Sequence, residues 1–473
     1  MGGSPDIPPE LAAEMTPAVR AFFDALIAQQ QEQIAALESR VAELEEQLGQ
    51  SPRNSSLPPS SEHPHARPDA AKKPGKSRRK RGGQPGHGKH SRELLPVGEV
   101  DELIPCVPAT CGGCGGKLTG SDPEPLRHQV WELPPIKPVV TEYQRHRLTC
   151  VCCHRSTCGE LPAGISTGTA GPRLTAMAAI LLSTFRLSSR QTKVMLESVF
   201  GVPASIGWID KLKVRATEVL RPAYDELREA LPDQPRLRID ETPWRQGTHR
   251  SWLWAFVAGV FTVFQIAASR KREELTGAIG EDYGGVVISD RATMYEHLAT
   301  QQYCWAHLKR DFQSIAESRD AQAGEIGEGL LWATEVVFRQ FGRHRDGTIG
   351  FAGLKSSLGG VRMEVEALLL RGLRCDHAKT SGRCQKLYWN RRCLWTFLEH
   401  EGVELTNNAA ERAIRGPVIK RKLSFGTQSD AGSRFVETTQ TIVETCRQQN
   451  RNALDYITEA LTAGKAASLL QGV

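Results

Sequence analysis

Three acidic residues lie where carboxylates can do chemistry. Asp240 follows the alternating segment Arg236-Leu-Arg-Ile239, and Asp290 ends the apolar run that begins at Gly285. Both segments have the pattern of strands, and open α/β sheets place their chemistry at the C-terminal ends of such strands. Glu411 lies later, at the start of a helical pattern. A single Asp at a strand end is more often a cap or turn residue, so one such acid does not indicate a catalytic site, and the inference rests on all three.

Converging carboxylates are typical of sites that hold two divalent metal ions. Cutting and joining phosphodiesters uses two such ions about 3.5–4 Å apart, one at the attacking oxygen and one at the leaving oxygen. Carboxylate oxygens are hard ligands that suit Mg²⁺ or Mn²⁺. Glu241 directly follows Asp240 but points to the opposite face of the strand, so it is the weaker candidate.

Two cysteine pairs have the spacing of metal ligands. They form two Cys-x-x-Cys knuckles, and four thiolates suit one structural, tetrahedral Zn²⁺ ion. Twelve cysteines in 473 residues are too few for a secreted disulfide scaffold. The expected ligands are Cys111, Cys114, Cys150 and Cys153. Neighbouring residues that keep the ligand assignment open are Cys106, Cys152, Cys158 and His154.

Positive charge is concentrated in one short segment. The net charge is +6, but residues 66–92 hold ten Lys or Arg residues and one acid, so this segment carries +9 and the remainder −3. Such a block is typical of nucleic-acid binding, although a solubilising linker has the same composition. The part of it that is expected to contact DNA is Arg78, Arg79, Lys80 and Arg81.

The elements that position the acids alternate between strands and helices. A strand from residue 236 that ends at Asp240 is followed by a hairpin over 252–266, a helix over 272–280, a strand over 285–290 and a short strand that enters a helix at 303–310. Residues 311–400 have helical patterns only. A further helix begins with Asn407 or Asn408 as its N-cap, and Gly416-Pro417 is expected to end it.

Helical patterns also precede the first strand. Residues 23–48 form a heptad that favours a parallel two-stranded coiled coil, and hence a homodimer or higher oligomer; the alternative is one helix docked on its own domain. Residues 191–200 and 205–215 flank a turn in a helix-turn-helix pattern, which also arises by chance in helical bundles. The residues that its second helix would present to DNA are Lys211, Lys213 and Arg215.

Several motifs together resemble the transposases of the insertion sequence 66 family. The resemblance runs over nearly the whole chain, in family order, and includes the two cysteine knuckles. The motifs of the catalytic region are Ile239-Asp-Glu-Thr-x-Trp244, Ser289-Asp290, Cys304-Trp-Ala-His-x-x-Arg310 and Thr406-Asn-Asn-x-x-Glu-Arg412; those of the N-terminal region are Asn54-Ser-Ser-x-Pro-Pro-Ser-Ser61 and Arg81-Gly-Gly-Gln-Pro-Gly-His87. His154 stands where the family commonly has glycine.

The resemblance implies a multidomain α/β plus α protein. It implies a ribonuclease-H-like mixed sheet with Asp240, Asp290 and Glu411 as a DDE triad, a helical insertion before Glu411, and a zinc-binding module. Glu411 with Arg415 also fits a solvated helix salt bridge, and His307 fits either a phosphate contact or a hydrogen-bonded histidine. Further residues expected to contact DNA are Arg310, Arg412, Arg415, Lys420, Arg421 and Lys422.

These patterns divide the chain into eight expected parts. They are a coiled-coil helix (1–49), a disordered basic linker (50–100), the zinc-binding module (101–165), a helical DNA-binding region (166–232), the first part of the catalytic core (233–314), a helical insertion (315–403), the last part of the core (404–428) and a C-terminal helical region (429–473).

The expected function is metal-dependent DNA strand cleavage and strand transfer at the ends of a mobile element. Two Mg²⁺ or Mn²⁺ ions and one structural Zn²⁺ are the expected cofactors. DNA, a second copy of the chain and accessory proteins of the same element are the expected partners, in the bacterial cytoplasm and without a membrane. The alternatives are a catalytically inactive, zinc-containing DNA-binding regulator and a nuclease on the same fold.

Overall fold

The computed structural model describes residues 15–48, 54, 93–165 and 168–470. At its centre is a mixed five-stranded sheet in the order β5-β4-β3-β6-β7. The pairs β3–β4 and β4–β5 are antiparallel, whereas β3–β6 and β6–β7 are parallel. The strands are β3 (Arg236–Gln246), β4 (His249–Val257), β5 (Thr262–Ala267), β6 (Val286–Ser289) and β7 (Gln301–Tyr303).

The central strand β3 separates two apolar cores. Leu237 and Ile239 lie in a core with Trp254 and Phe256, whereas Trp244 lies in a core with Leu253. Successive side chains of a strand point to opposite faces. The neighbours Asp240 and Glu241 therefore leave β3 on different sides of the sheet, as the alternation in the sequence predicted.

The expected end of β3 was wrong. The strand continues beyond Asp240 to Gln246 and pairs with β4 along that whole length. Its parallel pairing with β6, however, stops at Arg238, opposite Ile288. Asp240 therefore lies just beyond the end of the parallel ladder, and the antiparallel hairpin keeps the strand extended past it.

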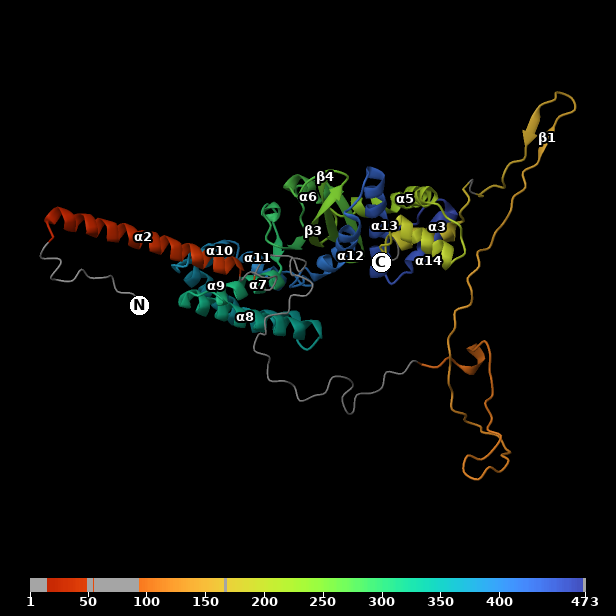
Figure 1. The fold of residues 1–473 in the computed structure, drawn as a ribbon, viewed down its shortest axis with the longest axis horizontal. Coiled ribbons are helices and arrows are strands. Elements are labelled where there is room, and N and C mark those ends of the chain that lie inside the picture. The colour runs from red at the N-terminus through yellow and green to blue at the C-terminus, as the bar shows by residue number, and fades with distance from the viewer. Residues whose placement is uncertain (1–14, 49–53, 55–92, 166–167, 471–473) are drawn as a thin grey trace.

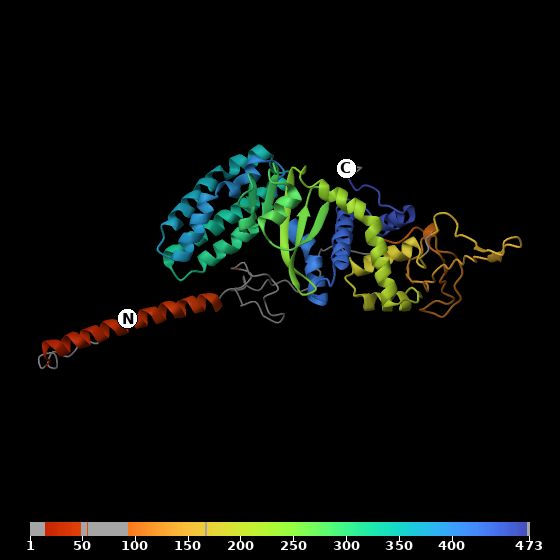
Figure 2. The same ribbon diagram turned by 90° about the horizontal axis from the view of Figure 1, so that it is seen from above.

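Helices flank the sheet at its two edges. Figure 2 shows the sheet between a helical group on the β7 side and a second group on the β5 side. The first group is α7 (Trp305–Ala316), α8 (Ala321–Arg345), α9 (Phe351–Leu373), α10 (Ala378–Trp389) and α11 (Arg392–Glu399). The second is α3 (Pro172–Leu182), α4 (Ser189–Ser198), α5 (Ile206–Glu229), α13 (Asp430–Gln448) and α14 (Ala453–Ala463).

Helix α13 covers the backbone of the edge strand β5. The amides of Thr262 and Phe264 donate to the hydroxyls of Thr445 and Thr441, at 3.2 and 2.9 Å, and the Ile266 amide donates to Glu437, at 2.7 Å. Four residues of a helix rise about 6 Å, close to the rise of two strand residues. The polar residues of α13 thus match alternate amides and protect an edge that would otherwise pair with another chain.

The connecting elements between β5 and β7 agree with the predicted order. Helix α6 (Arg272–Ile279) follows β5, and the short helix η3 (Thr293–Tyr295) follows β6. Helix α12 (Asn408–Ser424) follows the insertion. Contrary to expectation it continues through Gly416-Pro417, because Ala413, Ile414 and Pro417 are buried against the rest of the fold and this packing offsets the hydrogen bond that proline cannot make.

The N-terminal elements extend away from the sheet (Figure 1). They are α2 (Pro17–Leu48), η2 (Val97–Glu99), β1 (Arg147–Thr149) and β2 (Ser156–Cys158). Residues 139–148 alternate in polarity as a strand would, but only β1 forms at the end of this segment, since the side chains before it are largely exposed and meet no core. Within the described ranges, no helix is both long and apolar enough to cross a membrane.

Candidate active site

Asp240 lies within β3, and Asp290 directly follows the neighbouring strand β6. Arg238 of β3 pairs with Ile288 of β6. Asp240 and Asp290 each lie two residues after this pair, so the two acids follow it in the same register. The Glu241 amide donates to Asp240 Oδ1 at 3.0 Å, and the Ala292 amide donates to Asp290 Oδ1 at 2.9 Å. One oxygen of each carboxylate is thereby oriented by the backbone.

Helix α12 brings Glu411 to the same face and is attached to β3 at both ends. At its start, the buried Asn407 side chain donates to the Ile239 carbonyl of β3 at 2.6 Å. Beyond its end, the Thr427 amide donates to the Arg245 carbonyl at 2.9 Å. Of the two predicted N-cap residues, Asn407 holds that position and Asn408 begins the helix, but the Asn407 side chain binds the sheet and does not cap the helix.

The acids repel one another. Burial, followed by the charges of Glu241, Glu411 and Asp290, holds the pKa of Asp240 well above its usual range. A divalent cation would relieve this repulsion, and the oxygen donors fit a hard ion such as Mg²⁺ or Mn²⁺. The three carboxylates Asp240, Asp290 and Glu411 are the residues that would hold such ions.

The Glu241 side chain is buried on the other face of β3. It is only 2% exposed and accepts hydrogen bonds from Arg270 Nε at 2.6 Å and Tyr295 Oη at 2.6 Å. Arg270 also lies 3.4 Å from Asp290 Oδ2. Burial and the charge of Asp290 raise the pKa of Glu241 to about 7, although Arg270 opposes that shift. The sequence carries no motif that would have identified Arg270 or Tyr295.

His307 lies beside Glu411. Its Nδ1 is 3.8 Å from Glu411 Oε1, and Cys304 completes a close group with these two residues. Burial lowers the pKa of His307, and the Glu411 charge opposes this. The carboxylate of Glu411 is thus the charged neighbour of His307 in this structure, and the phosphate contact considered for His307 stays a prediction. The Cys-x-x-His spacing at the start of a helix is the sequence signal that brings Cys304 and His307 together.

The two cysteine knuckles have the same backbone geometry. The Gly115 amide donates to the Cys111 carbonyl at 2.9 Å, and the His154 amide donates to the Cys150 carbonyl at 2.9 Å. The left-handed turn position is Gly115 (φ 73°) in one knuckle and His154 (φ 52°) in the other. His154 thus takes the place of the turn glycine.

The first thiol of each knuckle has surroundings that favour its thiolate, but the two knuckles are not adjacent. Hydrogen bonds from the following backbone amides lower the pKa of Cys111 and of Cys150, and thiolates are the form that binds Zn²⁺. Among the residues that the structure describes, the four sulfurs do not gather into one group at metal-ligand spacing. Residues 118–146 between them form no helix or strand and expose apolar side chains such as Leu126 and Val139, so no core folds the segment back.

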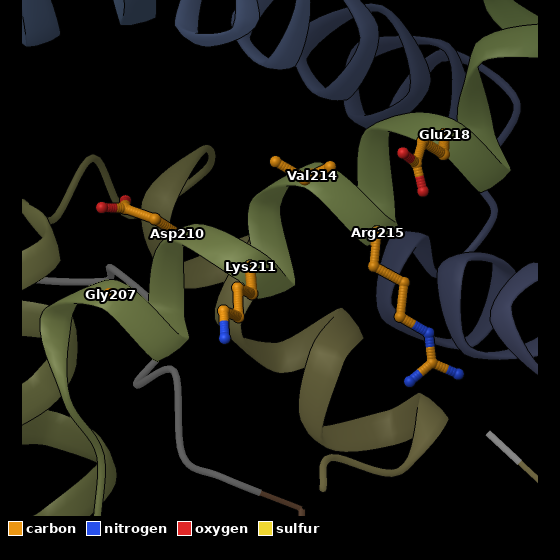
Figure 3. A pocket seen from close by; sticks show the side chains of 6 residues that line it. All are labelled: Gly207, Asp210, Lys211, Val214, Arg215 and Glu218. Atoms are coloured by element: carbon orange, nitrogen blue, oxygen red, sulfur yellow. The ribbon is translucent and has the colours of Figure 1, made fainter. Parts of the chain in front are cut away.

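The basic residues of α5 differ in their surroundings. Figure 3 shows Lys211 and Arg215 extending to one side of the helix, with Asp210 and Glu218 directed elsewhere. Arg215 donates to the Ala170 carbonyl at 2.9 Å, and Lys213 pairs with Asp210 at 2.6 Å. Lys211 is the exposed member of the three predicted DNA contacts.

The basic residues around Glu411 divide into exposed and inward-facing side chains. Arg412, Arg415 and Lys422 are exposed, and Arg310 is half-buried. Lys420 faces inward, contrary to its expected DNA contact, and donates to the Leu182 carbonyl at 2.6 Å. Arg421 donates to Thr242 at 2.8 Å and to the Pro243 carbonyl. The predicted DNA contacts Arg78, Arg79, Lys80 and Arg81 lie outside the described residues.

Comparison with known families matches three parts of the chain. Residues 167–434 match the family described as "Transposase IS66 family", which is more than half of the chain. Residues 108–154, which include both knuckles, match the "zinc-finger binding domain of transposase IS66". Residues 7–93 match a "Family of unknown function (DUF6444)".

Similar proteins occur in Sinorhizobium fredii (strain NBRC 101917 / NGR234). The uncharacterized protein y4qI is 25% identical over 408 residues, covering 77% of this chain and 72% of the relative. The uncharacterized protein y4hP is 24% identical over 405 residues, with the same coverage of each. With the acids, the knuckles and the family match taken together, the chain belongs to the IS66 family of transposases.

Proposed function

We propose that this chain is a DDE-type DNA transposase that cleaves and joins DNA strands through Asp240, Asp290 and Glu411. The observation that carries the proposal is the attachment of α12 to β3 at both ends, which brings Glu411 near enough to Asp240 for its charge, with that of Asp290, to raise the pKa of Asp240. The strand order, with three antiparallel strands followed by two parallel ones, supports a ribonuclease-H-like core.

The roles of the residues follow from their placement. Two bound Mg²⁺ or Mn²⁺ ions would activate water and then the freed 3′-hydroxyl, and would stabilise the leaving oxygen. Asp240 and Asp290 present carboxylate oxygens from rigid strands, and Glu411 closes the site from α12. Arg412 and Arg415 lie exposed on the same helix and are placed to bind DNA phosphates. Arg310 and Lys422 are assigned a supporting role in the same contact.

The remaining parts are assigned to DNA binding and assembly. Residues 101–165 would fold around one Zn²⁺ held by Cys111, Cys114, Cys150 and Cys153. The α4–α5 pair in the 166–232 region would present Lys211 to DNA, and the basic segment 66–92 would add phosphate contacts. Because DNA is the proposed substrate, the bacterial cytoplasm is the proposed location.

Helix α2 is assigned to self-association with a second copy of this chain. Its heptad side chains are exposed, including Ile34 (52%), Leu37 (65%) and Val41 (53%). A second α2 would cover this stripe in a parallel coiled coil. Sedimentation of the chain without residues 1–50 should show weaker self-association than the full chain. Equal association of the two would assign the stripe to another role.

Analysis of DNA products distinguishes the proposed function from its two alternatives. The purified chain is incubated with Mg²⁺, a target plasmid and a DNA fragment that carries both segments flanking the coding region. Joined products are the expected result. Cleaved products without joining would favour a nuclease on the same fold. Binding without any cleavage would favour a regulator. The flanking DNA should also carry inverted repeats and a short target duplication.

A further inference from the structure

Glu411 has two neighbours that are not carboxylates. Cys304 and His307 each offer one ligand atom, and these atoms and a Glu411 carboxylate oxygen all lie within 4.8 Å of one another. Across residues 15–48, 54, 93–165 and 168–470, this is the one group of three His, Cys, Asp or Glu side chains at that spacing. A thiol, an imidazole and a carboxylate are the three ligand types that Zn²⁺ uses.

Two atoms of this group are buried without a hydrogen-bond partner. They are His307 Nδ1 and Glu411 Oε1, which face each other at 3.8 Å. That separation exceeds hydrogen-bond range. Each buried polar atom left unsatisfied costs about 1–3 kcal/mol, so the pair lacks a binding partner that would contact both. A cation between them would be such a partner.

The local structure also suits a metal ion. Cys304 is the N-cap of α7 and His307 lies three residues later, so both side chains reach the same side of the first turn. The Asn407 amide donates to Cys304 Sγ at 3.2 Å, as backbone amides do to metal-bound thiolates. A tetrahedral ion bound at about 2.1 Å separates nitrogen and oxygen ligands by about 3.4 Å. The observed 3.8 Å therefore needs a shift of only a few tenths of an ångström.

We propose that Cys304, His307 and Glu411 form a second transition-metal site, which binds Zn²⁺ or a similar thiophilic divalent ion. Sulfur and nitrogen ligands select such ions over Mg²⁺. An ion bound there holds Glu411 toward α7, so it competes for Glu411 with the hard ions of the DNA-cleaving site. The binding site is independent of the proposed transposase activity, whereas the competition rests on that activity.

Zinc content tests the site directly. The full-length protein is equilibrated with Zn²⁺, separated from unbound ion and analysed for zinc per chain. The expected content is two ions in the unchanged protein and one in Cys304→Ala and in His307→Gln. Cys446→Ala, which shortens another buried cysteine in a different core, is the matched control and should keep two. Cys114→Ser should lose only the knuckle ion.

Equal zinc content in the unchanged protein and in a folded Cys304→Ala or His307→Gln variant would overturn the site. Circular dichroism confirms folding, and if one variant fails to fold the other decides.

Zinc inhibition tests the competition. Mg²⁺-dependent cleavage of the flanking-DNA fragment should fall as Zn²⁺ is added, and Cys304→Ala should require at least tenfold more Zn²⁺ for the same inhibition. Identical inhibition of the two proteins would overturn the competition. If neither protein cleaves DNA, the proposed function fails, while the zinc content still decides whether the site exists.

Discussion

The acidic site and the cysteine knuckles assemble in different ways. Asp240, Asp290 and Glu411 come from two strands and a helix separated by up to 171 positions, and a buried sheet holds them together. The knuckles are local turns on an exposed segment, each complete within six residues, and among the described residues no hydrogen bond joins one knuckle to the other. The acidic site therefore depends on the core, whereas a zinc site at the knuckles depends on the metal itself.

This difference predicts that the two metal sites fail separately. Removing one of four zinc ligands should weaken zinc binding at the knuckles by at least about 100-fold, since structural zinc contributes about 10–16 kcal/mol over its ligands. Cys114→Ser should therefore lose the knuckle zinc and keep its Mn²⁺ affinity, whereas Asp290→Asn should do the reverse. Metal analysis measures the zinc content, and Mn²⁺ titration measures the Mn²⁺ affinity. Loss of both metals in either variant would show that the regions are coupled.

The junction between α12 and β3 should be the most sensitive backbone contact of the acidic site. Gly426 has φ 101°, and a Cβ there would meet the Arg245 carbonyl oxygen at 2.1 Å. Gly426→Ala should cost about 2–4 kcal/mol of unfolding free energy and weaken Mn²⁺ binding. Gly464→Ala is the control, because its φ is 75° with open space around it, and should cost about 1 kcal/mol. Denaturant unfolding measures the loss of unfolding free energy in both variants. Equal losses in Gly426→Ala and Gly464→Ala would contradict the close packing of the α12–β3 junction.

Stability of the core should depend on pH through Lys420. Burial lowers the pKa of Lys420 to about 8 from 10.5, so the folded protein releases this proton more readily than the unfolded chain. Stability should therefore rise with pH between 8 and 10.5, and charged Lys420 should be a cost at pH 7. The advantage of Lys420→Met over the unchanged protein should be about 2–3 kcal/mol larger at pH 7 than at pH 10.5. An advantage independent of pH would place Lys420 in solvent.

The smallest expected effect concerns the second knuckle. His154 has a left-handed backbone conformation. This conformation is about 1 kcal/mol less favourable for histidine than for glycine. His154→Gly should therefore raise zinc affinity about fivefold, and Gly115→Ala in the first knuckle should lower it by a similar factor. Competition with a chelator measures both. A loss of zinc from His154→Gly would make His154 a ligand and not a turn residue.

The elements that carry the three acids could largely be predicted from sequence, because each acid lies near one end of a regular pattern. Alternation at Leu237 and Ile239 separated Asp240 from Glu241, and the apolar run before Asp290 identified the second strand. The helix at Glu411 was also predicted, but its continuation through Pro417 was not. That continuation depends on burial of Ala413 and Ile414 against the sheet, which is a tertiary effect.

Contacts between distant segments were beyond the sequence patterns. Arg270 and Tyr295 have no periodicity that connects them to Glu241, and Lys420 belongs to a basic run that looks exposed. The match of α13 hydroxyls to β5 amides pairs residues about 180 positions apart. Such contacts arise only when the elements pack, so only the structure could identify them.

The most direct test of the central claim compares the two adjacent acids of β3. Mg²⁺-dependent cleavage of the flanking-DNA fragment is measured for Asp240→Asn and Glu241→Gln, with folding and zinc content verified in both. If Asp240 holds the metal, the cleavage rate of Asp240→Asn should be at least about 10³-fold lower than that of the unchanged protein, which is the loss seen when other enzymes lose an essential catalytic group. Glu241→Gln should remain within about tenfold of the unchanged protein. Full cleavage by Asp240→Asn would contradict the account.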